Sequence, residues 1–172
     1  TELKIFLFQN YMILNKLKKL GKINHSYNLR SVIKNPVKSI LKRNKQRRGQ
    51  KKFREKLIKK YDSKCALLGI HASLCDAAHI YPYAECKHSQ EKYDENNGIL
   101  LSATLHKAYD KNYFWIDEET CQIKINYPQL EKDKIENLKA VGLDGFEDFY
   151  IEKLDNNYGK EYLKKRNSTI RK

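Results

Sequence analysis

The sequence predicts an α+β protein, with a small sheet and its covering helix at the centre and helices on both sides. The main observation is the order of patterns in residues 74–126, where short apolar runs typical of strands alternate with a stretch at helical spacing. A second observation is an apolar stripe at helical spacing in the residues that precede them. A chain of 172 residues with 40% apolar residues can bury one modest core of this kind.

Mainly helical structure is expected before the core. Apolar residues recur at a helical period in residues 3–20, where Gly21 is a plausible C-cap, although the opening "LKIFLF" could instead form a strand. A second short helix is expected at residues 37–45, because Pro36 suits a first helical turn. Gly49 is expected to break this helix and to open another. The apolar stripe of that next helix consists of Phe53, Leu57, Ile58 and Tyr61.

The core is expected to contain two strands, a connecting loop and a helix. The stretch "LCDAAHIYPY" (residues 74–83) predicts a strand that Pro82 ends, and the polar residues 84–97 predict a loop. The stretch "GILLS" (residues 98–102) is short and apolar, as a buried strand would be, and "ATLHKAYDKN" (residues 103–112) has helical spacing. Strand, loop, strand and helix is the resulting order.

A hairpin and two helices are expected after the core helix. The stretches "YFWID" (residues 113–117) and "CQIKINY" (residues 121–127) predict two strands that a turn connects. Helical spacing then recurs near residues 129–140 and again near residues 158–166.

Positive charge is concentrated at the start of the chain. The net charge is +14, and residues 1–60 hold 19 Lys and Arg against two Glu, whereas residues 61–172 hold 16 basic and 19 acidic residues. Such a block indicates a polyanionic partner, above all nucleic acid, because its few large apolar residues suit a membrane surface poorly. A solvated lysine-rich surface is the alternative. The residues expected to bind DNA are Arg43, Lys45, Arg47, Arg48, Lys51, Lys52 and Arg54.

The cysteines and the apolar runs favour an intracellular protein without membrane contact. The cysteines are Cys65, Cys75, Cys86 and Cys121. They show no paired C-x-x-C spacing, and a chain of this size does not need disulfides, so buried free thiols are expected. A zinc site that adds His71 or His88 to some of them is the weaker alternative. No run could span a bilayer and no signal peptide is evident, although the chain starts at Thr1, so a cytoplasmic protein is expected.

The core and the basic helix before it resemble a known family. The run "RRGQKKFREKLIKKYDSKCALLG", followed by "AAHIYPY" and "NNGILLSATLHKAYDKNYFWID", resembles the HNH nuclease family, whose core is the ββα-metal motif. The resemblance is strongest to the branch common among bacterial restriction-type endonucleases. It covers about residues 48–126, and "EYLKKRN" near the end resembles the usual tail of that branch. It implies hydrolysis of phosphodiester bonds.

Such hydrolysis needs a base to deprotonate water, positive charge on the phosphorane oxygens and help for the departing 3′ oxygen. Imidazole can act as the base near neutral pH, and the resemblance assigns this role to His79. It assigns to Asn97 the bracing of the loop between the strands, for which a carboxamide suits because it both donates and accepts. The alternatives are a histidine that only caps a strand and an Asn-Gly turn.

His106 and Asp110 are the expected metal ligands. Their i, i+4 spacing places both side chains on one helix face, and His106 takes the position of the last histidine of the HNH pattern. A carboxylate ligand together with open water positions favours Mg²⁺ or Mn²⁺. The alternative is a pair that only stabilises the helix.

Two features depart from the family pattern. Many HNH enzymes have an Asp or His ligand immediately before the catalytic histidine, where this chain has Ala78, and Asp76 on the same side of the strand is a weak candidate to assist. Many HNH domains also bind zinc through two C-x-x-C pairs. Here Leu68, Ser102 and Leu105 stand where such cysteines would be, so structural zinc is not expected.

The sequence thus predicts a metal-dependent endonuclease of restriction type that cleaves double-stranded DNA. His79, Asn97 and His106 form the expected catalytic set. Residues 1–48 would be a basic DNA-binding or dimerisation region, residues 49–126 the HNH core, and residues 127–172 a helical extension packed on it. A homodimer is expected, because one chain holds one motif and a duplex has two strands. The alternatives are a non-catalytic DNA-binding protein on an HNH scaffold and a homing or phage endonuclease.

Overall fold

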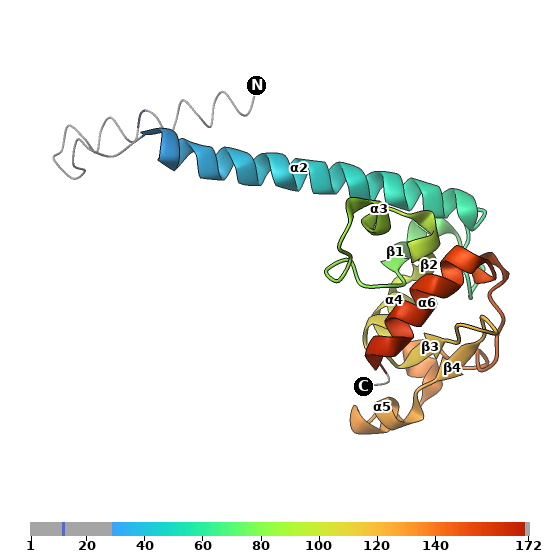
Figure 1. Cartoon of the computed structure of the whole chain (residues 1–172). Coiled ribbons are helices and arrows are strands. Elements are labelled where there is room, and N and C mark those ends of the chain that lie inside the picture. The colour runs from blue at the N-terminus through green and yellow to red at the C-terminus, as the bar shows by residue number, and fades with distance from the viewer. Residues whose placement is uncertain (1–11, 13–28, 171–172) are drawn as a thin grey trace. The chain divides into compact units, whose positions relative to one another are not determined.

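The computed structural model describes Met12 and residues 29–170 of the 172-residue chain (Figure 1). By its internal contacts the chain divides into two compact units, residues 1–48 and residues 49–172. The described elements are helices and two small antiparallel sheets, which confirms the predicted α+β class. The helix expected at residues 3–20 lies outside the described residues, apart from Met12, which is helical.

Helix α2 (Leu29–Lys60) is one continuous helix, so the prediction of two helices separated at Gly49 was wrong. A Cβ atom on Gly49 would lie only 2.3 Å from Cζ of Tyr93, which shows that the ring packs directly on the helix backbone. A glycine inside a helix costs about 0.5–1 kcal/mol relative to alanine. Packing against Tyr93 accounts for the glycine here, and one such residue does not end a helix that tertiary contacts support.

Strands β1 (Cys75–His79) and β2 (Gly98–Ser102) form the first antiparallel sheet, with Cys75 opposite Ser102 and His79 opposite Gly98. Helix α4 (Ala103–Asp110) follows β2 without a loop and packs against both strands. Its first turn is capped by Ser102, whose side chain accepts a hydrogen bond from the Leu105 amide at 3.3 Å. The predicted order of strand, connection, strand and helix is therefore confirmed.

The connection between β1 and β2, predicted as a loop, contains helix α3 (Ser89–Lys92) and the 3₁₀ turn η2 (Glu95–Asn97). A further 3₁₀ turn, η1 (Ala72–Leu74), precedes β1. Two of the polar residues that suggested a loop, Glu91 and Asp94, cap these short elements. Glu91 accepts hydrogen bonds from the amides of Lys87 and His88, and Asp94 accepts one from the Asn96 amide. Polar side chains that cap helices give the same composition as a loop.

Strands β3 (Phe114–Ile116) and β4 (Ile123–Ile125) form the predicted hairpin. Helix α5 (Tyr127–Lys132) is much shorter than the helix predicted at residues 129–140. It ends because Lys134 takes a left-handed conformation with φ 57° and the Ile135 amide bonds back to the Leu130 carbonyl at 2.8 Å. The 3₁₀ turns η3 (Leu138–Val141) and η4 (Glu152–Leu154) follow. Helix α6 (Asn157–Ile170) extends past both predicted ends.

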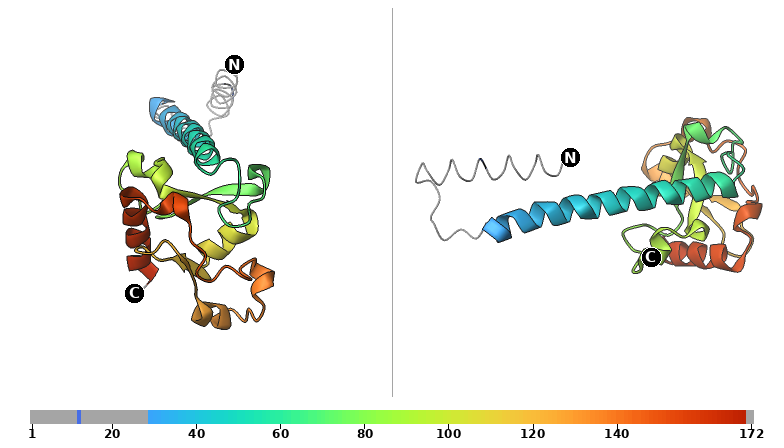
Figure 2. Two further views of the ribbon diagram at one scale, coloured as in Figure 1. Left: turned by 90° about the vertical axis from the view of Figure 1, so that its right-hand side faces the viewer. Right: turned by 90° about the horizontal axis from the view of Figure 1, so that it is seen from above.

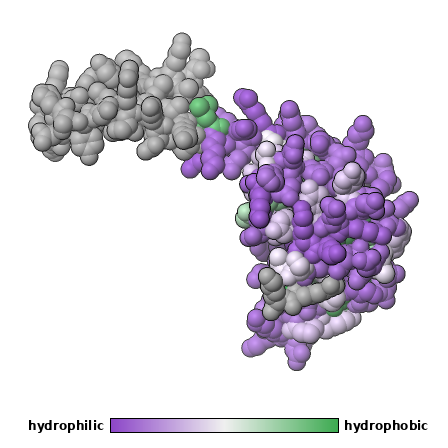
Figure 3. Space-filling model, viewed as in Figure 1, coloured by the Kyte–Doolittle hydropathy of each residue, from purple (hydrophilic) through white to green (hydrophobic). Residues whose placement is uncertain are grey.

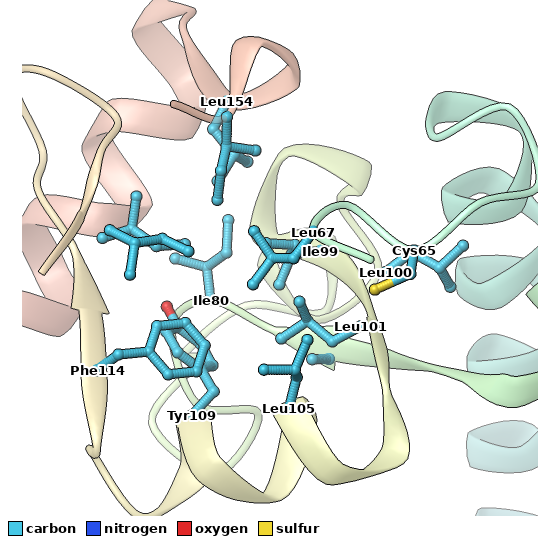
Figure 4. Close-up of a cluster of buried hydrophobic side chains, with 14 of the residues drawn as sticks. Cys65, Leu67, Ile80, Ile99, Leu100, Leu101, Leu105, Tyr109, Phe114 and Leu154 are labelled. Carbon is cyan, nitrogen blue, oxygen red and sulfur yellow. The ribbon is translucent and has the colours of Figure 1, made fainter. Parts of the chain in front are cut away.

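One hydrophobic core fills the unit of residues 49–172 (Figure 4). The rings of Tyr109 and Phe114 lie 5.2 Å apart within it, and Leu154 joins the same core from the C-terminal part of the chain. Helix α6 lies against η2 and thus against the β1–β2 connection (Figure 2). The four cysteines are buried free thiols, as predicted.

The described surface turned toward the viewer in Figure 3 is mostly hydrophilic. No helix within the described part of the chain is both long and apolar enough to cross a membrane.

Candidate active site

The ring of His79, at the end of β1, is held by contacts on several sides. Its Nε2 lies 2.9 Å from the carbonyl oxygen of Lys92. The ring of Phe53 is stacked on it with 4.4 Å between centroids, and Tyr83 meets it edge-on at 5.5 Å. Because a carbonyl oxygen can only accept, Nε2 carries the proton of the neutral ring. Nδ1 is then the nitrogen that is free to take up a proton.

The surroundings of His79 also favour its neutral form. Burial lowers the pKa of His79 below its ordinary value, and the nearby His106 lowers it further, whereas the Lys92 carbonyl and the Asp110 carboxylate oppose this change. The lowered pKa favours the neutral ring, which is the form that can accept a proton. His106 and Asp110 of α4 thus lie near enough to His79 to influence its pKa.

Gly98 allows helix α2 to approach the sheet at His79. Its backbone is extended, with φ −143° and ψ 148°, so the Asn-Gly pair forms no tight turn here. A Cβ atom on Gly98 would lie 2.6 Å from Phe53 and 2.7 Å from Leu57. Glycine thus provides the space in which the Phe53 ring reaches His79. In the sequence, Phe53 belongs to the apolar stripe and to the run that resembles HNH nucleases, but the sequence reasoning assigned it no role at the site.

Asn97 is fully buried and ties together the two ends of the β1–β2 connection. Its Oδ1 accepts a hydrogen bond from the Tyr81 amide at 2.7 Å. Its Nδ2 lies 3.2 Å from the Tyr81 carbonyl, 3.0 Å from the Glu91 carbonyl and 3.5 Å from Sγ of Cys86. The side chain therefore donates and accepts at once, which is the property that the sequence reasoning required of it.

His106 stands on α4 between two carboxylates. Its Nε2 lies 3.7 Å from Oδ2 of Asp110, one helical turn later, and its Nδ1 lies 3.2 Å from Oδ2 of Asp76 on β1. Ala78 is fully buried, so β1 offers no ligand at the position where many HNH enzymes have one. Asp76, two residues earlier, is the carboxylate of this strand that reaches His106.

The arrangement can offer a cation two protein ligands. Among the described residues, no group of three or more His, Cys, Asp and Glu side chains is placed to hold a metal ion. His106 and Asp110 supply one imidazole nitrogen and one carboxylate oxygen from the same face of α4. Such a pair suits a Mg²⁺-type ion, which usually keeps several waters and completes its shell with substrate phosphate.

The basic residues of α2 fall into two groups. Six of the seven predicted DNA-binding side chains are exposed: Arg43, Lys45, Arg47, Arg48, Lys51 and Lys52. Arg54 is half-buried, and its guanidinium donates to the carbonyl oxygens of Cys75 at 2.6 Å and Ala72 at 2.8 Å. These bonds hold the start of β1 against α2. Arg54 is therefore engaged within the protein, and we leave it out of the proposed DNA contacts.

Helix α6 braces both halves of the site through the buried Arg166, whose role the sequence reasoning missed. Its guanidinium donates to the carbonyl oxygens of Ile80 at 3.2 Å and Tyr109 at 2.6 Å, and it lies 3.7 Å from the centre of the Tyr109 ring. Ile80 directly follows His79, and Tyr109 directly precedes Asp110. The one available signal was the resemblance of "EYLKKRN", which contains Arg166, to a family tail.

The comparisons with known proteins agree with this geometry. No curated protein matches the chain. Residues 65–117 match a family described as HNH endonuclease. The matched segment contains β1, β2 and α4 with all four predicted catalytic and metal-binding residues, whereas Phe53 and Arg166 lie outside it. Residues 65–117 are therefore similar to HNH endonucleases, and they hold the whole set of predicted catalytic and metal-binding side chains.

Proposed function

We propose that the protein is a metal-dependent endonuclease of restriction type that hydrolyses phosphodiester bonds in double-stranded DNA. The observation that carries this proposal is the geometry of His79, whose Nε2 lies 2.9 Å from the Lys92 carbonyl oxygen, so that Nδ1 is the nitrogen left to accept a proton. A fixed, neutral imidazole in a domain of this family is suited to general-base work.

In this proposal, Nδ1 of His79 takes the proton from the attacking water, while the Lys92 carbonyl stabilises the imidazolium that forms. Phe53 keeps the ring in one plane, and Asn97 holds the connection that carries Lys92. These groups fix the direction of attack before DNA binds, and such positioning is a large part of catalytic power.

His106 and Asp110 would hold Mg²⁺ or Mn²⁺. Such an ion supplies positive charge for the phosphorane oxygens and for the departing 3′ oxygen. With only two protein ligands, the remaining positions are available to water and to phosphate oxygens of DNA. Asp110 also raises the pKa of His79, so one carboxylate acts on both the base and the ligand pair.

The exposed basic residues of α2 would contact DNA phosphates, whose binding releases condensed counterions. Cleavage of both strands calls for two sites, and each chain holds one domain of this kind, so we propose a homodimer as the working form. Sedimentation as a monomer at working concentration, with and without DNA, would remove the dimer from the proposal.

The test is cleavage of supercoiled plasmid by the purified protein with Mg²⁺ or Mn²⁺ and with chelator. His79→Ala should abolish cleavage but leave DNA binding nearly unchanged, because a base acts in the transition state and not in ground-state affinity. His71→Ala is the matched control, since His71 is exposed and its ring bonds to the neighbouring Ser73.

Turnover of His79→Ala within tenfold of the unaltered protein would refute the assignment of the base. DNA binding without cleavage by the unaltered protein would favour the alternative of a non-catalytic DNA-binding protein, for which the buried Ala78 is the supporting observation. Sequencing of the ends of digested plasmid and phage DNA would separate restriction from homing specificity.

A further inference from the structure

Asp76 is the acidic residue of β1 that contacts the candidate metal site. It lies on the same face of the strand as Ala78, because side chains two residues apart share a face. Its carboxylate is about half exposed, and its Oδ2 is 3.2 Å from Nδ1 of His106. Asp76 is thus placed against the side of the imidazole that faces away from Asp110.

This contact determines which nitrogen of His106 carries the proton. An ionised carboxylate has only acceptor sites, so Nδ1 of His106 must be the donor in the bond to Asp76. In the neutral ring, Nε2 is then unprotonated and presents a lone pair. It faces Oδ2 of Asp110 at 3.7 Å, which is too far for a hydrogen bond. With a neutral ring, two electron-pair donors face each other there, an arrangement that a cation between them, either a proton on Nε2 or a metal ion, would stabilise.

We infer that Asp76 is the positioning residue of this metal site, which fixes the tautomer and orientation of His106 so that Nε2 and Asp110 take up a divalent cation. The inference rests on the proposed metal dependence. Histidine ligands commonly donate their second ring N–H to a carboxylate or carbonyl, which fixes the ring and strengthens it as a ligand. In this chain the support comes from β1, which supplies no ligand at Ala78.

The geometry favours an indirect role for Asp76 over direct ligation. Asp76 and Asp110 approach different nitrogens of one imidazole ring, and an ion bound at Nε2 lies on the side away from Nδ1. Consistent with this, no three-ligand group occurs among the described residues. The two site histidines also use opposite nitrogens. His79 has Nε2 bonded to a carbonyl, and His106 has Nδ1 bonded to a carboxylate.

The first experiment measures the tautomer directly in the metal-free full chain. Long-range ¹H–¹⁵N NMR at pH 8, where an ordinary histidine is neutral, reports which ring nitrogen is protonated. His106→Gln identifies the His106 signals by their loss. We expect an Nδ1–H tautomer in the unaltered protein and in Asp76→Asn, whose amide oxygen still accepts, but a mixture of tautomers in Asp76→Ala. Unchanged signals in Asp76→Ala would overturn the inference.

The second experiment is a calorimetric titration with Mn²⁺ alone. Asp76→Ala should weaken binding by about tenfold or more, the usual effect of removing such a supporting group, whereas Asp76→Asn should lose clearly less. Equal losses in the two variants would make Asp76 a direct ligand and overturn the positioning role. The control is Asp144→Ala, which removes a similarly exposed carboxylate whose partner is Lys139. This variant should bind Mn²⁺ like the unaltered protein.

Failure of the inference and failure of the proposed function give different results. If the unaltered protein binds no Mn²⁺, metal dependence itself is wrong. If the unaltered protein and Asp76→Ala bind Mn²⁺ equally, only the role of Asp76 is wrong, and the ligand pair of His106 and Asp110 stands.

Discussion

Gly98→Ala tests whether close packing of α2 on the sheet holds the proposed base in place. Gly98 faces Phe53 and Leu57 of α2, and it is the strand partner of His79. The substitution adds a single methyl group beside the Phe53 ring that is stacked on His79. Neither polar group nor charge changes, so any effect on cleavage would come from packing.

Two opposing effects determine how Gly98→Ala changes the free energy of unfolding. The backbone at Gly98 suits alanine, and replacing glycine at such a position stabilises a protein by about 0.4–1 kcal/mol through the unfolded state. The new Cβ would lie 2.6 Å from Phe53 and 2.7 Å from Leu57, well below the 3.4 Å at which ordinary contact begins. Overpacking of a tight core costs about 1–3 kcal/mol, and both neighbours are fully buried. We expect a net loss of about 1–2 kcal/mol.

Urea unfolding, followed by the fluorescence of Trp115, measures the stability, and plasmid cleavage measures the rate. Displacement of Phe53 should also move His79, and an error of about 1 Å in a reacting group can cost on the order of a hundredfold in rate. Gly145→Ala is a useful control, because Gly145 has φ 79° and open space around it, so it should lose stability through strain without slower cleavage. Stability within about 0.5 kcal/mol of the unaltered protein and an unchanged rate for Gly98→Ala would refute the reasoning.

Three further predictions address the base, the buried arginine and the basic helix. The acid limb of kcat/KM against pH should have its midpoint below the ordinary histidine value of about 6.5, because burial lowers the pKa of His79 and only the neutral ring accepts a proton; a midpoint above that value would contradict the assignment. Arg166→Met should lower the free energy of unfolding by more than about 2 kcal/mol, because each buried acceptor left unpaired costs about 1–3 kcal/mol. Lys164→Met, at an exposed position on the same helix, should change the free energy of unfolding little, and an equal change in both variants would disprove the bracing role. Replacing Lys51 and Lys52 by Gln should reduce the slope of log affinity against log salt by roughly 0.9 for each DNA phosphate that the protein no longer neutralises. The exposed Lys132→Gln is the control. An unchanged slope would show that Lys51 and Lys52 are only a solvated surface.

The central elements could be predicted because their residues follow simple local rules. The stretch "GILLS" coincides with β2, and the i, i+4 pair of His106 and Asp110 lies on α4 as expected. The errors arose where tertiary contacts decide the outcome. Gly49 suggested a break, but Tyr93 packs on it inside a continuous helix. The helix predicted at residues 129–140 ends at Lys132, because Lys134 adopts a left-handed backbone that no hydrophobic period reveals.

The contacts that support the site were harder to predict than its reactive side chains. Phe53 and Arg54 both belong to the basic run that resembles HNH nucleases, and the sequence reasoning placed Phe53 in the apolar stripe and Arg54 among the expected DNA contacts. The structure instead places Phe53 on the ring of His79 and bonds Arg54 to the carbonyls of Ala72 and Cys75. Both roles depend on how α2 packs against the sheet, and neither residue type nor spacing contains that information.

Asn97 illustrates how a residue without chemistry of its own can influence the proposed base. Its Nδ2 bonds the Glu91 carbonyl at 3.0 Å, and the next carbonyl along the chain, that of Lys92, is the one that bonds Nε2 of His79. The Asn97 side chain also bonds the backbone of Tyr81, two residues after His79. It therefore fixes the distance between the strand that carries the imidazole and the helical turn that determines its tautomer. The partner of His79 is the backbone oxygen of residue 92, which every type of residue would provide, so the identity of Lys92 does not indicate this contact. Asn97 is the residue whose type is needed to hold that oxygen in place.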